Sequence, residues 1–180
     1  MSLLSRKEVE PLTAYSDIQT AFIRYRDARD AYSNWLENHA LSSVRGYEAH
    51  LGLDSRRVKL NGKDQRYVQT GDPFHADGFK PSAFEGMSEN GSTLQFYMRV
   101  ALEESEQSHQ KSWIALRINC EKQGESVAYM IRADGFADVD PVSVRIPVRL
   151  EPPQRTDLYE AISAVIMSAL DASPYEMPKD

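Results

Sequence analysis

The sequence contains a single cysteine, Cys120, among its 180 residues. One thiol excludes an internal disulfide and a zinc site built from several thiolates. No apolar run approaches the roughly 20 residues that a membrane-spanning helix needs. Residues 1–13 carry four charged side chains and therefore lack the apolar core of a signal peptide. We expect a globular protein in the cytoplasm, without a membrane partner.

Motifs that carry catalysis are also lacking. None of the four histidines lies four residues from another on an expected helix, as a zinc pair would require. The glycines form no phosphate-binding loop, and no serine has the flanking glycines of a hydrolase elbow. Cys120 falls on the apolar side of its expected strand, as a small buried residue would.

Two loop segments nevertheless hold residue types that occur in sites. His75 and Asp77 form a metal or proton-transfer candidate, and Asp134, Asp138 and Asp140 form an acidic cluster. Aspartates in such loops more often support turns by bonding to the local backbone. We therefore expect no enzyme activity, no cofactor and no metal, and a small metal-dependent enzyme around His75 is only a third hypothesis.

Negative charge is in excess, because 27 acidic residues oppose 21 basic ones, giving a net charge of −6. Nucleic-acid-binding domains are usually basic, so this balance argues against a general nucleic-acid binder. The charge is uneven, however: Asp54–Arg66 holds five basic and two acidic residues. This segment is either a local basic patch or simply solvated surface.

A long helix is predicted from Ser16 to His39. Ser16 and Gln19 have the spacing of a capping box, and apolar residues then recur with helical spacing. They form one apolar stripe, which is typical of a docking face: Ile18, Phe22, Tyr25, Tyr32, Trp35 and Leu36.

The next segments are less regular. Residues 42–53 suit either a short helix or a strand. Asn61-Gly62 between Val58–Leu60 and Arg66–Val68 predicts a tight hairpin. Residues 70–92 contain many glycines and prolines without any period, which predicts a long loop.

Residues 93–150 alternate apolar and polar side chains over four runs, the pattern of an antiparallel meander with one wet face. Pro147 lacks an amide hydrogen and places the last run at an edge. Thr156 is expected to cap a final helix that extends to Leu170.

The predicted fold is therefore α+β. An antiparallel meander of four to six strands carries the long N-terminal helix and the C-terminal helix, packed on one face. We expect a single domain over residues 1–180, with a flexible start (1–15), the long loop (70–92) and an acidic tail (175–180).

The polar face of this meander gathers arginines and aromatic side chains. Such a face can hold a nucleic-acid strand through stacking and phosphate contacts. Alternatively, its arginines pair across strands with Glu103, Glu121 and Asp134. The face comprises Tyr97, Arg99, Trp113, Arg117, Arg132, Arg145 and Arg149.

The C-terminal half resembles the SecB-type export chaperones and their relatives in toxin–antitoxin systems. The resemblance lies in the order of elements: strands Leu94–Leu102, Trp113–Cys120 and Val127–Asp134, the step Gly135-Phe136, the helix Leu158–Leu170 and the tail Pro174–Pro178. The long N-terminal helix, the 70–92 loop and the regular run at 142–150 depart from that family. Its first strand would have to be formed by residues 45–53.

The resemblance implies a homo-oligomer without catalysis, whose apolar grooves hold an unfolded or disordered polypeptide. Methionine and aromatic side chains suit such a surface because they adapt to varied sequences. The candidate partner-binding residues are Tyr97, Met98, Trp113 and Met130. The leading hypothesis is thus a SecB-like binding protein, and the alternative is a nucleic-acid-binding module that uses the arginine-rich face.

Overall fold

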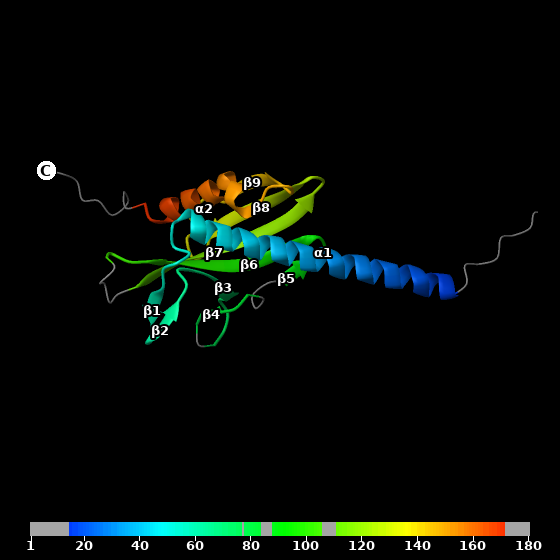
Figure 1. Ribbon diagram of the computed structural model, residues 1–180, viewed down its shortest axis with the longest axis horizontal. Helices are drawn as coiled ribbons and strands as arrows, with labels where there is room; N and C mark the ends of the chain where they lie inside the picture. The colour runs from blue at the N-terminus through cyan, green and yellow to red at the C-terminus, as the bar shows by residue number, and fades with distance from the viewer. Residues whose placement is uncertain (1–14, 77, 84–87, 106–110, 172–180) are drawn as a thin grey trace, which may run out of the picture. The chain divides into compact units, whose positions relative to one another are not determined.

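The computed structural model describes residues 15–76, 78–83, 88–105 and 111–171 (Figure 1). The chain divides into two compact units, residues 1–34 and 35–180. The described part of the first unit is the beginning of helix α1 (Tyr15–His50). The second unit holds the rest of α1 and every strand of the described chain.

The second unit is built on an antiparallel sheet. Its strands lie in the order β4-β3-β6-β7-β8-β9, and β5 pairs with β6 in addition. The bounds are β3 (Val68–Asp72), β4 (Lys80–Pro81), β5 (Ser88–Asn90), β6 (Thr93–Leu102), β7 (Ser112–Gln123), β8 (Ser126–Ala133) and β9 (Val142–Pro147). The predicted meander is β6 to β9, and β9 with Pro147 lies at the sheet edge, as predicted.

One face of the sheet is apolar and forms the core. Cross-strand partners share a face, and the register aligns Phe96 with Ile118 and then Ile131 on the next strand. These three side chains are almost fully buried. Strict alternation along β6, β7 and β8 therefore separates an inner face from an outer one.

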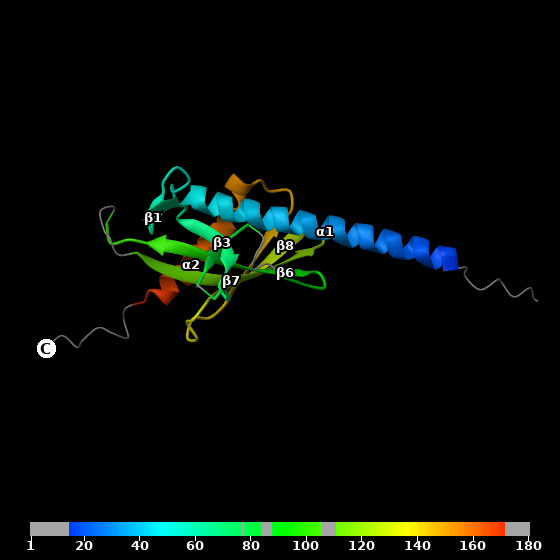
Figure 2. The same cartoon turned by 90° about the horizontal axis from the view of Figure 1, so that it is seen from below.

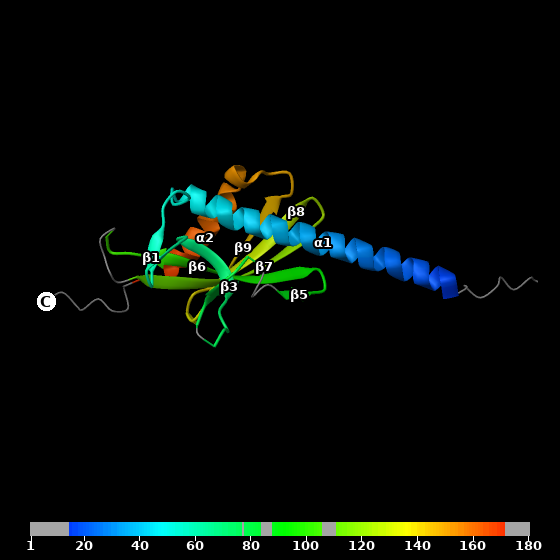
Figure 3. The same ribbon diagram turned by 60° about the horizontal axis from the view of Figure 1, so that its bottom comes forward.

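Two helices cover the inner face. The second part of α1 buries Leu36, Ala40 and Val44, which recur every four residues. Helix α2 (Thr156–Ala169) follows a short 3-10 turn, η1 (Pro152–Gln154), and packs against β8 and β9. Figure 3 shows α2 and this part of α1 lying side by side over the strands. The predicted α+β class, with both helices on one face, is confirmed.

A buried arginine joins the two helices. The Arg155 guanidinium donates to the carbonyl oxygens of Leu150 (3.0 Å) and His39 (3.2 Å), and to the hydroxyls of Ser42 (3.0 Å) and Ser43 (2.6 Å). Arg155 is 5% exposed. A charge removed from water needs such a set of acceptors, so this network fixes where α2 begins relative to α1.

The end of α1 differs from the prediction. The helix continues eleven residues beyond His39, and residues 51–53 close it with a Schellman motif, in which Leu53 N–H donates to Glu48 O and Gly52 N–H to Ala49 O. Gly52 has a φ of +68°, which favours glycine. The strand at residues 45–53 that the SecB resemblance requires is therefore absent, because these residues are mostly helical.

Other boundaries also change. Thr156 is the first residue of α2, and Arg155 occupies the cap position without a side-chain cap bond. Ser16 lies inside α1. The segment 70–92 is not a plain loop, because it contains the end of β3, all of β4 and β5. The expected flexible start (1–15) is wrong at Tyr15, which is the first residue of α1. The rest of that segment and the acidic tail lie outside the described residues.

The predicted turn at Asn61-Gly62 is confirmed, but its second strand begins directly after the turn and is not formed by Arg66–Val68. The turn joins β1 (Val58–Leu60) to β2 (Lys63–Gln65), and both turn residues have positive φ. Figure 2 shows this hairpin following the end of α1. Nearby, the fully buried carboxylate of Glu48 accepts a hydrogen bond from Arg66, which ties the end of the helix to the chain that enters β3.

Candidate functional site

The outer face of the sheet carries most of the predicted site residues. The register places Tyr97 opposite Arg117, and Arg117 opposite Arg132. Met130 lies in the next row, opposite Asn119 on β7 and Ser143 on β9. In the row beyond it, Ala128 lies opposite Glu121 and Arg145. The alternation in the sequence therefore placed these side chains on the correct face.

One end of the outer face is covered by the chain between β3 and β4. Phe74 from this segment meets the ring of Tyr97 edge-on at 5.4 Å between centroids. Tyr97 is only 4% exposed as a result. A tyrosine so covered cannot stack on a base or hold a client in this conformation.

Arg99 is enclosed at the same end. Its guanidinium lies 3.9 Å from the centroid of the Trp113 ring and 4.3 Å from that of Phe79. The same group donates from Nε and Nη2 to Oε1 of Gln69, at 3.0 and 2.8 Å. Burial lowers the pKa of Arg99 to about 10, so it remains charged at neutral pH. These contacts engage Arg99 and one face of Trp113 within the protein.

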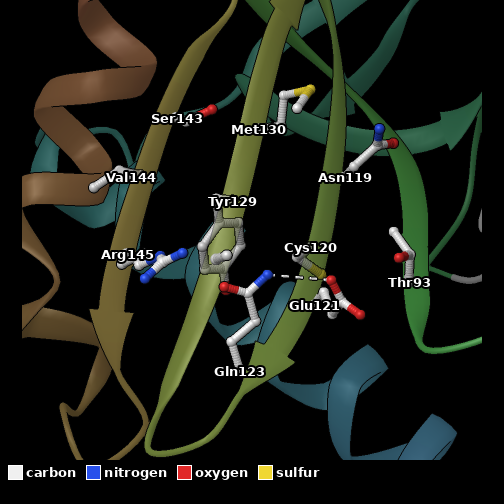
Figure 4. Close-up of a pocket in the computed structure, with 11 residues that line it drawn as sticks. Thr93, Asn119, Cys120, Glu121, Gln123, Tyr129, Met130, Ser143, Val144 and Arg145 are labelled. Atoms are coloured by element: carbon white, nitrogen blue, oxygen red, sulfur yellow. Dashed lines mark hydrogen bonds between the residues drawn. The ribbon is translucent and has the colours of Figure 1, made fainter.

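The other end of the outer face is open and hollow (Figure 4). The hollow has a volume of about 610 Å³ and extends over β7, β8 and β9. Ala128 forms part of its floor, because this small side chain lies between the longer Glu121 and Arg145 on the flanking strands. Met130 borders the hollow and is 40% exposed. We call this region the β7–β9 hollow; its lining includes Thr93, Asn119, Glu121, Gln123, Ala128, Met130, Ser143 and Arg145.

The charges beside the hollow differ in their engagement. Both oxygens of Glu121 accept hydrogen bonds, from Ser92 and from Gln123. The Ser92 hydroxyl and then the Gln123 amide lower the pKa of Glu121. Among the described residues, no hydrogen bond or ion pair engages Arg117, Arg132 or Arg145. Two arginines directly opposite one another repel, so this row favours an anionic neighbour.

Two predicted residues lie elsewhere, and a third is engaged within the protein. Met98 is on the inner face and fully buried, so it is not part of the outer surface. Arg149 follows β9, which ends at Pro147, and does not belong to the arginine row. Trp113 is on the outer face but lies under Arg99.

The structure bears on the other candidates only as far as its described residues reach. Asp77, the partner expected for His75, lies outside the described residues. Among the residues that the structure describes, no three His, Cys, Asp or Glu side chains are grouped so as to hold a metal ion, and this includes Asp134, Asp138 and Asp140. Burial raises the pKa of Cys120 to about 12, which keeps it a thiol at neutral pH.

Sequence reasoning missed the residues that cover and shape the outer face. Phe74 and Phe79 come from the segment without a period, and Gln69 follows the predicted strand Arg66–Val68, so no pattern placed these side chains over the outer face. The signal for the hollow was present in the β8 pattern, where Ala128 is the smallest side chain between two long neighbours. It becomes readable only when the register of three strands is known.

Of the helices in the described part of the chain, none combines the length and apolar character that crossing a bilayer takes. Comparisons with protein-family models, with curated proteins and with solved structures found no match.

Proposed function

We propose that this protein is a non-enzymatic binding protein that holds an unfolded or disordered polypeptide, as SecB-like chaperones do, and that the β7–β9 hollow receives the client. The observation that carries the proposal is the hollow itself: an open concavity on a sheet face, with an apolar floor at Ala128 and an exposed thioether at Met130. The proposed place of action is the cytoplasm, and toxin–antitoxin or defence systems are the proposed setting.

The chemistry of the hollow suits a polypeptide of mixed character. Ala128 and Met130 offer apolar surface to a client side chain, and a thioether adapts to different shapes. Arg117, Arg132 and Arg145 lie on the same face and attract acidic residues of the client. The preferred client is therefore an extended segment in which apolar and acidic side chains occur together.

The same geometry weighs against nucleic acid. Binding of single strands relies on exposed aromatic rings as stacking platforms. On this face Tyr97 is covered by Phe74, and Trp113 carries the Arg99 guanidinium on its ring. Arg99 itself is engaged by Gln69. Two of the five arginines in the predicted nucleic-acid surface, Arg99 and Arg149, are thus engaged or displaced from the row.

The test is a binding titration with a fluorescently labelled polypeptide that has been reduced and alkylated so that it cannot fold. Met130→Glu places a charge beside the hollow, and Ala128→Leu fills its floor. We expect each change to weaken binding about tenfold, the equivalent of about 1.4 kcal/mol. The control is Met167→Glu on α2, where a more exposed methionine (69% against 40% for Met130) lies away from the hollow. Equal binding by all four proteins would contradict the proposal.

A second function is favoured by one observation, the unpaired arginines opposite one another at residues 117 and 132. If this row binds nucleic acid, the affinity for a single-stranded oligonucleotide falls steeply with salt. The double variant Arg117→Ala, Arg132→Ala then abolishes that binding, whereas Met130→Glu leaves most of it. The polypeptide proposal expects no measurable oligonucleotide binding at physiological salt.

A further inference from the structure

The first half of α1 exposes an unusual number of large apolar side chains. Every side chain from residue 15 to 31 is exposed. Among them, Tyr15, Ile18, Phe22 and Tyr25 are between 55% and 73% exposed. Exposed apolar residues that gather on one surface, rather than being scattered singly, mark an interaction site.

The spacing of these four residues indicates what kind of partner fits. They lie three, four and three residues apart, which is the a and d pattern of a coiled-coil seam. The residue directly before the first seam position of a heptad is small, as at Ala21 and Ala28. The stripe is thus a narrow apolar seam on a regular helix, suited to another helix.

A lipid surface is the poorer occupant. Helices that lie on membranes carry an excess of basic residues on the polar face. Between residues 15 and 34, three arginines are balanced by three aspartates, and no lysine occurs. This balanced helix gains little from anionic lipids.

A second copy of the helix fits in the antiparallel direction. With the two-fold axis at the level of Thr20, Tyr15 faces Tyr25 of the second copy and Ile18 faces its Phe22. These four residues therefore face one another, as an isologous interface requires, whereas Ile23, which is 47% exposed, lies beside the seam. A parallel pair would instead bring Arg29, the next seam residue, against its own copy.

We propose that this protein forms a homodimer through an antiparallel pairing of α1, with Tyr15, Ile18, Phe22 and Tyr25 as its seam. The proposal is independent of the client site, because it rests on residues of the first unit. None of the four seam residues lines the β7–β9 hollow.

The first test measures solution mass by light scattering over a wide range of protein concentration, since mass action makes dimerisation concentration-dependent. The wild-type chain is expected to reach twice its 20.4 kDa. The variant Ile18→Glu, Phe22→Glu should remain monomeric throughout. Thr20→Glu, on the opposite side of the same helix, should dimerise like the wild type, and circular dichroism checks that helix content is equal in all three.

The second test reads the direction of pairing from spin labels on exposed positions, because Cys120 is buried and does not react. A label at Ala21→Cys, beside the seam and one residue from the axis, should lie close to its copy. A label at Asp30→Cys, ten residues from the axis, should lie about 30 Å or more from its copy at 1.5 Å of rise per residue. Short distances at both positions would replace the antiparallel pairing with a parallel one.

A wild-type chain that stays monomeric, or a dimer that survives the double substitution, would overturn the proposal. Loss of dimerisation with unchanged polypeptide binding supports the dimer and leaves the client site intact. Conversely, loss of polypeptide binding in Met130→Glu with an unchanged solution mass supports the client site and leaves the dimer intact.

Discussion

Single residues decide which parts of the outer face are available. Arg99 illustrates the point: five predicted arginines look equivalent in the sequence, but this one stacks on Trp113 and Phe79 and bonds to Gln69. Arg117 and Arg132 have no such contacts within the described chain. Exposure of a charged side chain therefore depends on tertiary neighbours that alternation cannot reveal.

Arg155 is expected to be the most costly arginine to replace. Arg155→Met would remove the charged donor from the Leu150 and His39 carbonyls and from two serine hydroxyls, of which the His39 carbonyl keeps its bonds from Ser42 and Ser43. Because a hydrogen bond to a charged group contributes about 1.5–3 kcal/mol, the free energy of unfolding should fall by about 3 kcal/mol or more. Urea denaturation measures it. The matched control is Arg132→Met on the outer face, for which a change within about 0.5 kcal/mol is expected.

His39 should make stability depend on pH. Burial, and then the positive charge of Arg155, lowers the pKa of His39 from 6.5 to about 4. The unfolded state therefore binds more protons between these values, and stability is lost as pH falls through this window. Unfolding curves at pH 7 and pH 5 should show a decline that is smaller in His39→Asn. An identical decline in both proteins would assign the effect to other groups.

At the scale of elements, strands were predicted better than helix ends. Alternation from Leu94 to Ile146 follows directly from a sheet with one buried face, so β6 to β9 could be read without a structure. The end of α1 could not, because Gly46 weakens a helix by local propensity. Tertiary contact overrides this: a Cβ on Gly46 would lie 1.9 Å from Tyr159 Oη. Because Gly46 has no Cβ, Tyr159 of α2 can pack directly against α1 at this position.

Gly46→Ala therefore tests the contact between the helices. Alanine favours an isolated helix by about 1 kcal/mol, but overpacking against Tyr159 costs about 1–3 kcal/mol. We expect a net loss of up to about 2 kcal/mol in thermal or urea unfolding. Adding Tyr159→Phe, which removes the clashing hydroxyl, should recover part of the loss relative to Tyr159→Phe alone. Stabilisation by Gly46→Ala would mean that the helices are farther apart.

At the scale of the whole molecule, different segments of the chain provide stability and the two proposed binding surfaces. The inner face of the sheet with α2 and the second part of α1 gives stability. The outer face contains the β7–β9 hollow, and the first part of α1 presents an apolar seam. The sequence indicated both the apolar stripe of the helix and the polar sheet face. The hollow could be recognised only from the register of β7, β8 and β9, and the cover over Tyr97 only from the position of Phe74.

The most direct test of the central claim is to locate a bound polypeptide on the surface. A photoreactive amino acid is placed at residue 130 beside the hollow or at residue 167 on α2, and the protein is irradiated with a labelled polypeptide that cannot fold. We expect cross-links from residue 130 that excess unlabelled polypeptide suppresses, and few from residue 167. Equal cross-linking from both positions, or none from residue 130 while the polypeptide remains bound, would contradict the assignment of the hollow as the client site.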